Sequence, residues 1–260
     1  MNIAVVTGAS SGMGKEFVLA LDKQYELDEI WVVARREQLL CELQSEVSAK
    51  IVVLPLDLTK EESFEKYKNA LEESCPNVKV LVNAAGFGKF LHFEKTPLAS
   101  LMQMVDLNSK ALMAITYLTL PYVKEGGEIY QMGSLSSFQP VPCINVYGAT
   151  KAFVLSFSRA LNVELAPKKI KVMAVCPGWI KTEFFSHAIE DQTINYFNRY
   201  YTPQQVVKKA LIDMKKGKDV SILGFPVRMQ VRAVKLLPTK MVMKIWCKQQ
   251  KINTKPPKNK

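Results

Sequence analysis

The sequence predicts a doubly wound α/β fold, in which helices cover both faces of a parallel sheet. Short apolar runs rich in β-branched residues alternate with longer segments whose apolar residues recur at helical spacing. Most of these runs are too continuously apolar for a half-exposed strand, so both faces of the sheet should be buried. Ligands of such sheets bind beyond the carboxyl ends of the strands, which is where we look for functional residues.

The expected strands and helices alternate along the chain. We expect strands over residues 3–7, 30–34, 50–56, 78–83, 128–132, 170–176 and 219–224. We expect helices over residues 14–25, 36–47, 63–74, 98–120 and 147–165. The pattern predicts a single domain over residues 1–224 and a basic amphipathic extension over 225–260, whose last residues are disordered.

The composition excludes several classes of protein. With 260 residues, 48% of them hydrophobic, the chain can bury one large core. The five cysteines are scattered without a CxxC pair and there are only two histidines, so we expect no disulfide framework and no metal site. The N-terminus lacks a signal-peptide pattern and no apolar run is long enough to span a membrane, which predicts a cytoplasmic protein.

The positive charge is concentrated in the C-terminal part of the chain. The net charge is +11, yet residues 1–202 carry twenty lysines and arginines against twenty-two acidic residues. Residues 203–260 carry fifteen against two. No motif that reads a nucleic acid accompanies these basic residues, so we expect no nucleic-acid binding.

A glycine-rich turn follows the first expected strand and opens the first expected helix. Its glycines are spaced G-x-x-x-G-x-G, which permits a tight turn and a close backbone approach, and the helix N-terminus behind it attracts anions. The position between strand and helix favours a phosphate-binding turn over a plain connection. The cofactor-binding residues expected here are Gly8, Ser10, Ser11, Gly12, Met13 and Gly14.

The end of the second expected strand indicates which dinucleotide binds. Ala34 stands where an NAD-binding fold of this type usually has an acidic residue, and Arg35 and Arg36 follow it. A guanidinium can bind a 2′-phosphate in bidentate fashion, whereas a carboxylate would repel it. The pair therefore predicts NADP(H), although two arginines in solvent at the start of a helix are the alternative.

Further motifs follow the glycine turn in a fixed order. They are V-N-A-A-G at 82–86, a serine at Ser134, Tyr147 with Lys151 four residues later, and P-G-x-x-x-T at 177–182. In these motifs the sequence resembles the short-chain dehydrogenase/reductase family, whose members have a Rossmann-like fold and oxidise or reduce substrates with a nicotinamide cofactor.

The resemblance implies further cofactor contacts. Asp57 would accept a hydrogen bond from the adenine amino group, and its alternative role is the N-cap of the next helix. Asn83 would brace the central sheet. The remaining cofactor-binding residues that the resemblance implies are Leu58, Ala84, Gly86, Pro177, Gly178, Ile180 and Thr182.

The resemblance assigns catalysis to Ser134, Tyr147, Lys151 and Asn108. Tyrosine can protonate the alkoxide formed by hydride transfer, but its ordinary pKa of about 10 holds the proton tightly. The Lys151 ammonium would lower that pKa and would also donate to the cofactor ribose. Ser134 would hydrogen-bond the substrate oxygen, and Asn108 would hold a water that links Lys151 to solvent.

The segment 183–202 is expected to cover the substrate. Its aromatic residues, among them Phe184, Phe185 and Tyr196, could line an apolar pocket, although about half of these side chains should pack on the sheet instead. The segment therefore favours a small hydrophobic carbonyl or alcohol substrate over a sugar or a small acid.

The C-terminal extension has two alternative uses. Apolar residues alternate with lysines and arginines at helical spacing, as in a segment that lies on an anionic membrane surface. The alternative is that the apolar side packs on the body or on a partner subunit. The resemblance implies a homodimer or homotetramer built from the helices at 98–120 and 147–165.

Taken together, the motifs predict an NADPH-dependent oxidoreductase that interconverts a ketone and a secondary alcohol on a lipid- or steroid-like substrate. A 3-oxoacyl thioester reductase of fatty acid metabolism is the alternative enzyme. A non-catalytic NADP(H)-binding sensor and a peripheral membrane protein that acts through its tail are the alternatives outside catalysis.

Overall fold

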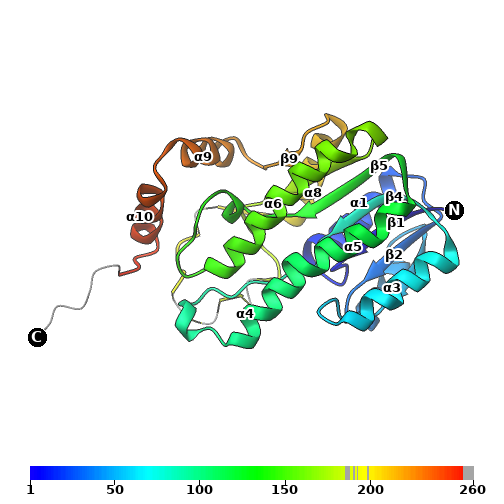
Figure 1. Cartoon of the computed structure of the whole chain (residues 1–260), viewed down its shortest axis with the longest axis horizontal. Helices are drawn as coiled ribbons and strands as arrows, with labels where there is room; N and C mark the ends of the chain where they lie inside the picture. Colours follow the sequence, from blue (N-terminus) through cyan, green and yellow to red (C-terminus); the bar gives the residue numbers. More distant parts are fainter. Residues whose placement is uncertain (185–187, 190, 192, 198, 254–260) are drawn as a thin grey trace, which may run out of the picture.

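The computed structural model describes residues 1–184, 188–189, 191, 193–197 and 199–253. A seven-stranded parallel sheet in the order β3-β2-β1-β4-β5-β6-β9 forms its centre (Figure 1). The order reverses direction between β1 and β4, which places a crevice at the carboxyl ends of these two strands. The doubly wound α/β fold predicted from the sequence is therefore confirmed.

The strands begin and end close to the expected positions. Their bounds are β1 Asn2–Thr7, β2 Glu29–Val33, β3 Lys50–Leu54, β4 Asn77–Asn83, β5 Val123–Met132, β6 Lys171–Val175 and β9 Val220–Ser221. β5 begins five residues earlier than expected, because its first residues lie in a polar, solvent-exposed stretch that has no strand pattern. β9 is shorter than the expected 219–224, because only Val220 and Ser221 pair with β6.

Both faces of the sheet are buried, as the continuous apolar runs predicted. Along β1, Ala4 and Val6 join the core cluster on one face, whereas Ile3 and Val5 join the cluster on the other. This alternation follows from the two-residue period of a strand. The sheet is therefore covered on both sides.

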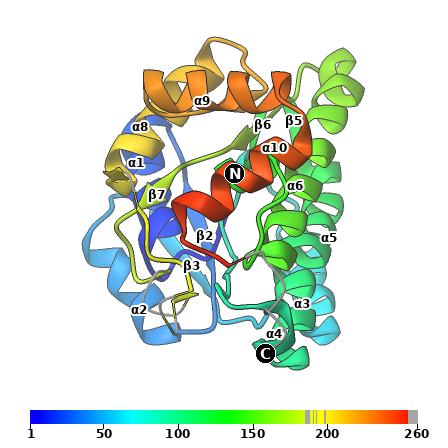
Figure 2. The same ribbon diagram turned by 90° about the vertical axis from the view of Figure 1, so that its left-hand side faces the viewer.

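Helices form one layer on each side of the sheet (Figure 2). One layer contains α1 Gly12–Gln24, α2 Glu37–Glu42 and α8 Pro203–Lys215, and α1 packs against α8. The other contains α3 Glu61–Ser74, α4 Leu98–Val105, α5 Leu112–Thr119 and α6 Asn145–Leu165. The expected helix 98–120 is one continuous segment, but it is π-helical over Asp106–Ala111.

Two short helices, α9 Phe225–Leu236 and α10 Thr239–Gln249, form the C-terminal extension. They lie across the carboxyl-end edge of the sheet rather than apart from the body (Figures 1 and 2). β7 Trp179–Ile180 and β8 Tyr200–Tyr201 pair with each other at the same edge. Phe185, expected in the substrate pocket, and residues 254–260, expected to be disordered, lie outside the described residues.

Candidate active site

A cavity of about 740 Å³ opens at the carboxyl ends of the strands. All of the expected cofactor-binding residues except Asn83 line it, as do Ser134, Phe184 and Tyr196. Asn83 and Asn108 are buried behind its wall. The structure thus brings Gly8 and Tyr196, which are 188 positions apart in the chain, into one cavity.

The backbone of the glycine turn is packed too closely at Gly8 and Gly14 to accept a side chain. Gly8 and Gly12 have φ values of +68° and +54°, which glycine adopts without strain. A Cβ on Gly14 would lie 2.2 Å from the Gly8 carbonyl oxygen, and one on Gly8 would lie 2.7 Å from the Ala85 nitrogen. Ser11, the N-cap of α1, makes no side-chain cap, so the first amides of this helix remain available to an anion. These features fit a dinucleotide pyrophosphate.

Arg36 lies at the mouth of the same turn. Its guanidinium donates to the Ser10 hydroxyl at 3.0 Å and to the Ser11 hydroxyl at 2.9 Å, and it pairs with the Glu183 carboxylate at 3.2 Å. Two hydroxyl groups and a guanidinium form a suitable site for a phosphate. The Glu183 carboxylate was not predicted as a site residue, and it lies beside the guanidinium that the sequence predicts for a 2′-phosphate.

Asp57 does not cap the following helix, because Lys60 is the N-cap of α3. Its Oδ1 instead accepts hydrogen bonds from the Thr59 amide at 3.0 Å and the Thr59 hydroxyl at 2.7 Å. Burial opposes ionisation of Asp57, but these bonds outweigh it and lower the pKa of the carboxyl group. The alternative role as a helix N-cap was therefore wrong, and the ionised side chain lines the cavity.

Asn83 ties together the central part of the sheet. Its Nδ2 donates to the Gln131 side chain on β5 and to the Thr116 hydroxyl on α5, both at 3.0 Å. The Thr7 hydroxyl accepts from the Ala85 amide at 3.2 Å, which fixes the backbone just after β4. These contacts hold the chain at Ala84–Gly86 against the cavity.

Asn108 lies in the π-helical turn and is fully buried. Its side chain pairs with the backbone of Phe87, accepting from the amide at 3.0 Å and donating to the carbonyl at 2.9 Å. Nδ2 also lies 3.1 Å from the Thr150 hydroxyl on α6. Asn108 therefore links three segments around Lys151, a geometry consistent with π-turns at functional sites.

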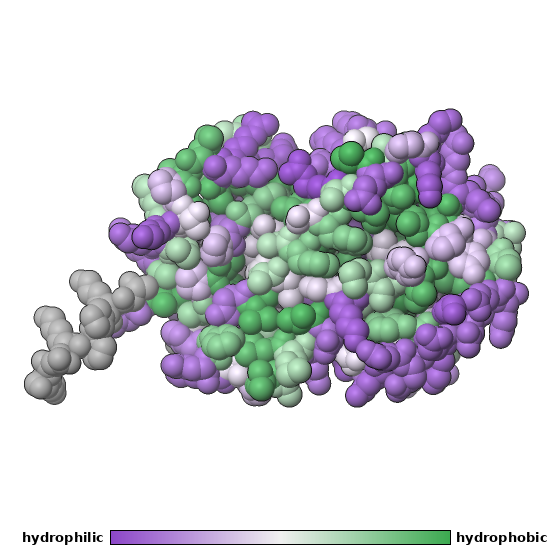
Figure 3. Space-filling model, in the orientation of Figure 1, coloured by the Kyte–Doolittle hydropathy of each residue, from purple (hydrophilic) through white to green (hydrophobic). Residues whose placement is uncertain are grey.

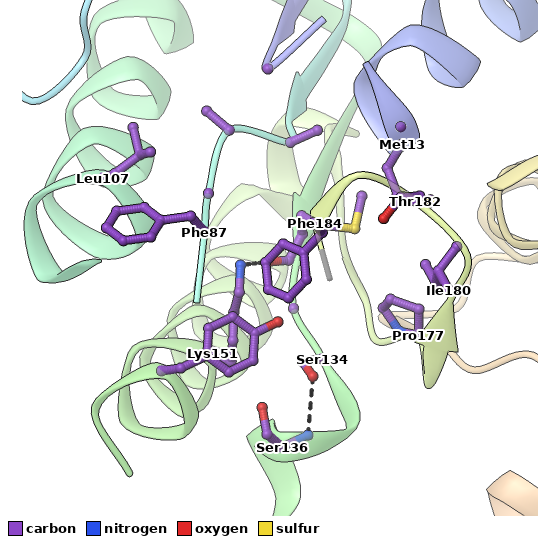
Figure 4. Close-up of a pocket in the computed structure, with 18 of the residues that line it drawn as sticks. Met13, Phe87, Leu107, Ser134, Ser136, Lys151, Pro177, Ile180, Thr182 and Phe184 are labelled. Atoms are coloured by element: carbon purple, nitrogen blue, oxygen red, sulfur yellow. Dashed lines mark hydrogen bonds between the residues drawn. The ribbon is translucent and has the colours of Figure 1, made fainter. Parts of the chain in front are cut away.

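Ser134 and Lys151 point into one region of the cavity, beside Phe184 (Figure 4). Ser134 follows β5 and is the N-cap of a short 3₁₀-helix, where its hydroxyl accepts from the Ser136 amide at 3.2 Å. The Ser137 hydroxyl donates to the Lys151 carbonyl at 2.7 Å and so joins this turn to α6. The Ser137 hydroxyl is thus used in a hydrogen bond that supports the fold. The buried Ser136 hydroxyl has no hydrogen-bond partner among the described residues.

The pKa of Tyr147 shifts in the direction opposite to the expected one. Burial raises it to about 12, although the nearby Ser134 hydroxyl lowers it. Burial lowers the pKa of Lys151 to about 8. The Lys151 Nζ donates to the Met132 carbonyl at 2.7 Å and lies 5.6 Å from the centre of the Tyr147 ring.

The part of the cavity beyond Tyr147 is apolar. The Phe90 ring centre lies 5.9 Å from that of Tyr147 and 6.1 Å from that of Phe184. Residues that the sequence analysis did not assign complete this wall: Phe90, Val141, Ile144, Trp179, Val231, Val234, Trp246 and Gln250. Phe90 is only 2% exposed and sits four residues after the N-A-A-G motif, which is the one sequence signal that could have pointed to it.

The C-terminal extension contributes part of this wall. Val227 and Val231 of α9 are buried, and the Trp246 indole donates to the Pro142 carbonyl at 3.1 Å. Of the two uses expected for the extension, packing on the body is therefore observed for its inner side. No helix among the described residues is long and apolar enough to cross a membrane, and no group of three metal-ligating side chains occurs among them.

Comparisons with known proteins identify the family of the chain. The profile of the short chain dehydrogenase family matches residues 2–193, and the chain belongs to the short-chain dehydrogenase/reductase family of oxidoreductases. A probable NADP-dependent dehydrogenase of Haemophilus influenzae is 37% identical over 180 residues, which cover 67% of this chain and 70% of that protein.

Two further relatives match nearly the whole chain. The very-long-chain 3-oxoacyl-CoA reductase of Bos taurus is 30% identical over 253 residues, covering 93% of this chain and 77% of that protein. A short-chain dehydrogenase from Sphingobium yanoikuyae, solved in complex with NADPH, superposes with a TM-score of 0.77 at 27% identity. That superposition covers 94% of this chain and 96% of the other.

Proposed function

We propose that this protein is an NADPH-dependent oxidoreductase that interconverts a ketone and a secondary alcohol on a lipophilic substrate. The observation that carries the proposal is the meeting of Ser134, Tyr147 and Lys151 where the glycine-lined part of the cavity joins its apolar part. The paired Arg35 and Arg36, the absence of an acid at Ala34, and the NADP(H)-binding relatives support the cofactor.

The chain's own residues supply the proton and hold the oxygen. Bound NADPH supplies a hydride to the carbonyl carbon, and the carbonyl oxygen then needs a proton. Tyr147, which is protonated near neutral pH, donates that proton from its hydroxyl. Ser134 donates a hydrogen bond to the same oxygen and stabilises the negative charge as it forms.

Lys151 and Asn108 support the proton transfer from Tyr147 without touching the substrate. The ammonium stabilises the phenolate left after proton donation, which requires Lys151 to be charged as Tyr147 loses its proton. Burial brings the pKa of Lys151 to about 8, so the ammonium can also pass a proton on near neutral pH. Asn108 fixes the backbone at Phe87 next to this ammonium.

A panel of ketones, hydroxysteroids and acyl thioesters, followed by NADPH absorbance, tests the proposal. We expect turnover of lipophilic ketones, and we expect Tyr147→Phe to lose at least about a thousandfold in kcat while NADPH binding is retained. If Tyr147→Phe kept both its turnover and its NADPH affinity unchanged, the assignment of Tyr147 as the proton donor would be wrong. NADPH binding without turnover of any compound would favour a sensor.

A second candidate is the reduction of a 3-oxoacyl thioester, which uses the same residues on the same type of carbonyl. The similarity to a very-long-chain 3-oxoacyl-CoA reductase over 93% of the chain favours it. The acyl thioesters in the panel distinguish the two candidates. A kcat/KM for long-chain 3-oxoacyl-CoA far above that for any simple ketone would select the thioester.

We also propose a homodimer or homotetramer that uses α4, α5 and α6. Large apolar side chains are exposed on these helices, namely Leu98, Met102, Tyr117, Phe153 and Val163. Their exposure in the single chain supports an interface there. Light scattering of the purified protein tests it, and a monomeric mass at micromolar concentration would exclude it.

A further inference from the structure

We propose that the outer side of the C-terminal extension docks on an anionic lipid bilayer. The docking face consists of the exposed apolar residues Phe225, Met229, Leu236, Leu237, Met241 and Ile245. Exposure and charge define this face, and neither depends on the reaction catalysed, so lipid binding and catalysis can be tested separately.

On α9 the apolar residues form two opposite stripes. Val227 and Val231 are buried against the body, whereas Phe225, Met229 and Leu236 are exposed, Phe225 by 66% and Leu236 by 86%. Positions 225, 229 and 236 are four and seven residues apart and so fall on one side of a helix. Packing on the body explains the inner stripe and leaves the outer one without a folding role.

α10 repeats this arrangement. Val242 and Cys247 are buried, and Trp246 faces the cavity. Met241 and Ile245, four residues apart, are exposed on the other side. Leu236 ends α9 and Leu237 follows it in the bend that leads to α10, so exposed apolar side chains occur on both helices and on the bend between them.

Basic side chains surround the docking face. Residues 225–260 contain no aspartate or glutamate. The exposed cations of the two helices are Arg232, Lys235, Lys240, Lys244 and Lys248, of which Lys235 lies over the Phe138 ring of the body. Figure 3 shows hydrophilic and apolar residues interspersed over this end of the molecule. This combination of apolar and cationic residues is the one that binds anionic lipid headgroups and the acyl chains beneath them.

A bilayer fits this surface better than a second copy of the chain. Two copies meeting through the docking face would bring their cations together with no acidic residue of the extension to offset them. The inner sides of the same helices line the substrate cavity through Val231, Val234 and Trp246. A docked protein would therefore hold its apolar cavity next to the lipid, from which a lipophilic substrate could enter.

Vesicle flotation with the full chain tests the proposal. The vesicles contain phosphatidylcholine alone or mixed with phosphatidylglycerol, in about 0.05 and 0.5 M salt. We expect binding to the mixed vesicles at low salt and weak binding otherwise. The double variant Lys240→Gln/Lys244→Gln should lose about 25-fold in affinity, or about fivefold per lysine. The variant Leu236→Ser/Met241→Ser should lose about tenfold or more.

The matched control is Lys66→Gln/Lys124→Gln, which removes the same charge from exposed positions outside the extension. It should bind like the unchanged chain. Equal loss in this control, salt-independent binding, or equal binding to both vesicle types would overturn the proposal. Loss of dimer mass rather than vesicle binding in Leu236→Ser/Met241→Ser would assign the face to a second copy instead.

Discussion

The side chain of Gln250 holds the backbone of Tyr196 by both of its hydrogen-bonding groups. Gln250 Oε1 accepts from the Tyr196 amide and Nε2 donates to the Tyr196 carbonyl, each at 3.0 Å. The same Oε1 accepts from the Asn195 amide at 3.1 Å. Gln250 is only 2% exposed, so the end of the extension fixes the segment that lines the substrate cavity.

We expect Gln250→Ala to weaken substrate binding. The change leaves two amides and a carbonyl without their partner, at a cost of about 1–3 kcal/mol for the segment at Tyr196. KM for a lipophilic substrate should rise about 5- to 100-fold, with a smaller change in kcat and none in NADPH affinity. Gln38→Ala, an exposed glutamine on α2, serves as the control. An unchanged KM in Gln250→Ala would show that the hydrogen bonds from Gln250 to the backbone at Asn195 and Tyr196 do not shape the cavity.

Asn108→Ala should destabilise the fold as well as the site. It removes three hydrogen bonds from a fully buried group and leaves both backbone groups of Phe87 unpaired. The expected loss is about 2–4 kcal/mol in the free energy of unfolding, measured by urea denaturation. Asn69→Ala, at an exposed position on α3, should cost well under that amount. Similar losses in both variants would contradict the role assigned to Asn108.

Lys151 should make stability depend on pH in alkaline solution. Burial lowers its pKa to about 8 from an ordinary 10.5, so between these values the unfolded chain binds the proton that the folded chain has lost. Stability therefore rises with pH in this window, by on the order of 2 kcal/mol between pH 7 and 9.5 for this group. Urea denaturation of the unchanged chain and of Lys151→Met should show this rise only in the former. Parallel pH profiles would refute it.

Glu183→Gln should increase the preference for NADPH over NADH. The Glu183 carboxylate pairs with Arg36 and would lie next to a 2′-phosphate held by that guanidinium. Both partners are largely exposed, so the gain should be about two- to fivefold in the ratio of kcat/KM values. Glu65→Gln, on the exposed side of α3, provides the control. A lower ratio in Glu183→Gln would indicate that the carboxylate supports the cofactor site by orienting Arg36.

The sequence was sufficient to predict those features of the fold and the site that depend on residues close together in the chain. Continuous apolar runs rich in β-branched residues predicted the strands, and the glycines between β1 and α1 predicted the turn that the structure shows. The positions of Ser134, Tyr147 and Lys151 followed from the resemblance of the motifs to the family, because spacing alone predicted only that the tyrosine and the lysine share a helix face. All three line the same cavity, as expected of groups placed at strand and helix ends.

The sequence was insufficient where long-range packing decides. The pairs Arg36–Glu183 and Gln250–Tyr196 join residues 147 and 54 positions apart, and no local pattern marks either of them. The pKa of Tyr147 depends on how deeply the ring is buried and on where the Lys151 ammonium points, which spacing on a helix does not specify. For the extension, the sequence predicted packing on the body only as one of two alternatives, because its exposed and buried apolar residues have the same helical spacing.

The π-helical turn at Asp106–Ala111 places Asn108 at the site by means of one additional residue in the helix. A π-turn contains one more residue than an α-turn, so deletion of a single residue here could restore an ordinary α-helix. The residues before the deletion would then rotate by about 100° relative to α5. Asn108 would lose its place at Phe87 while the remaining helical hydrogen bonds re-formed. Loss of one codon in this turn could thus yield a descendant that keeps the sheet and its helices but lacks the arrangement around Lys151.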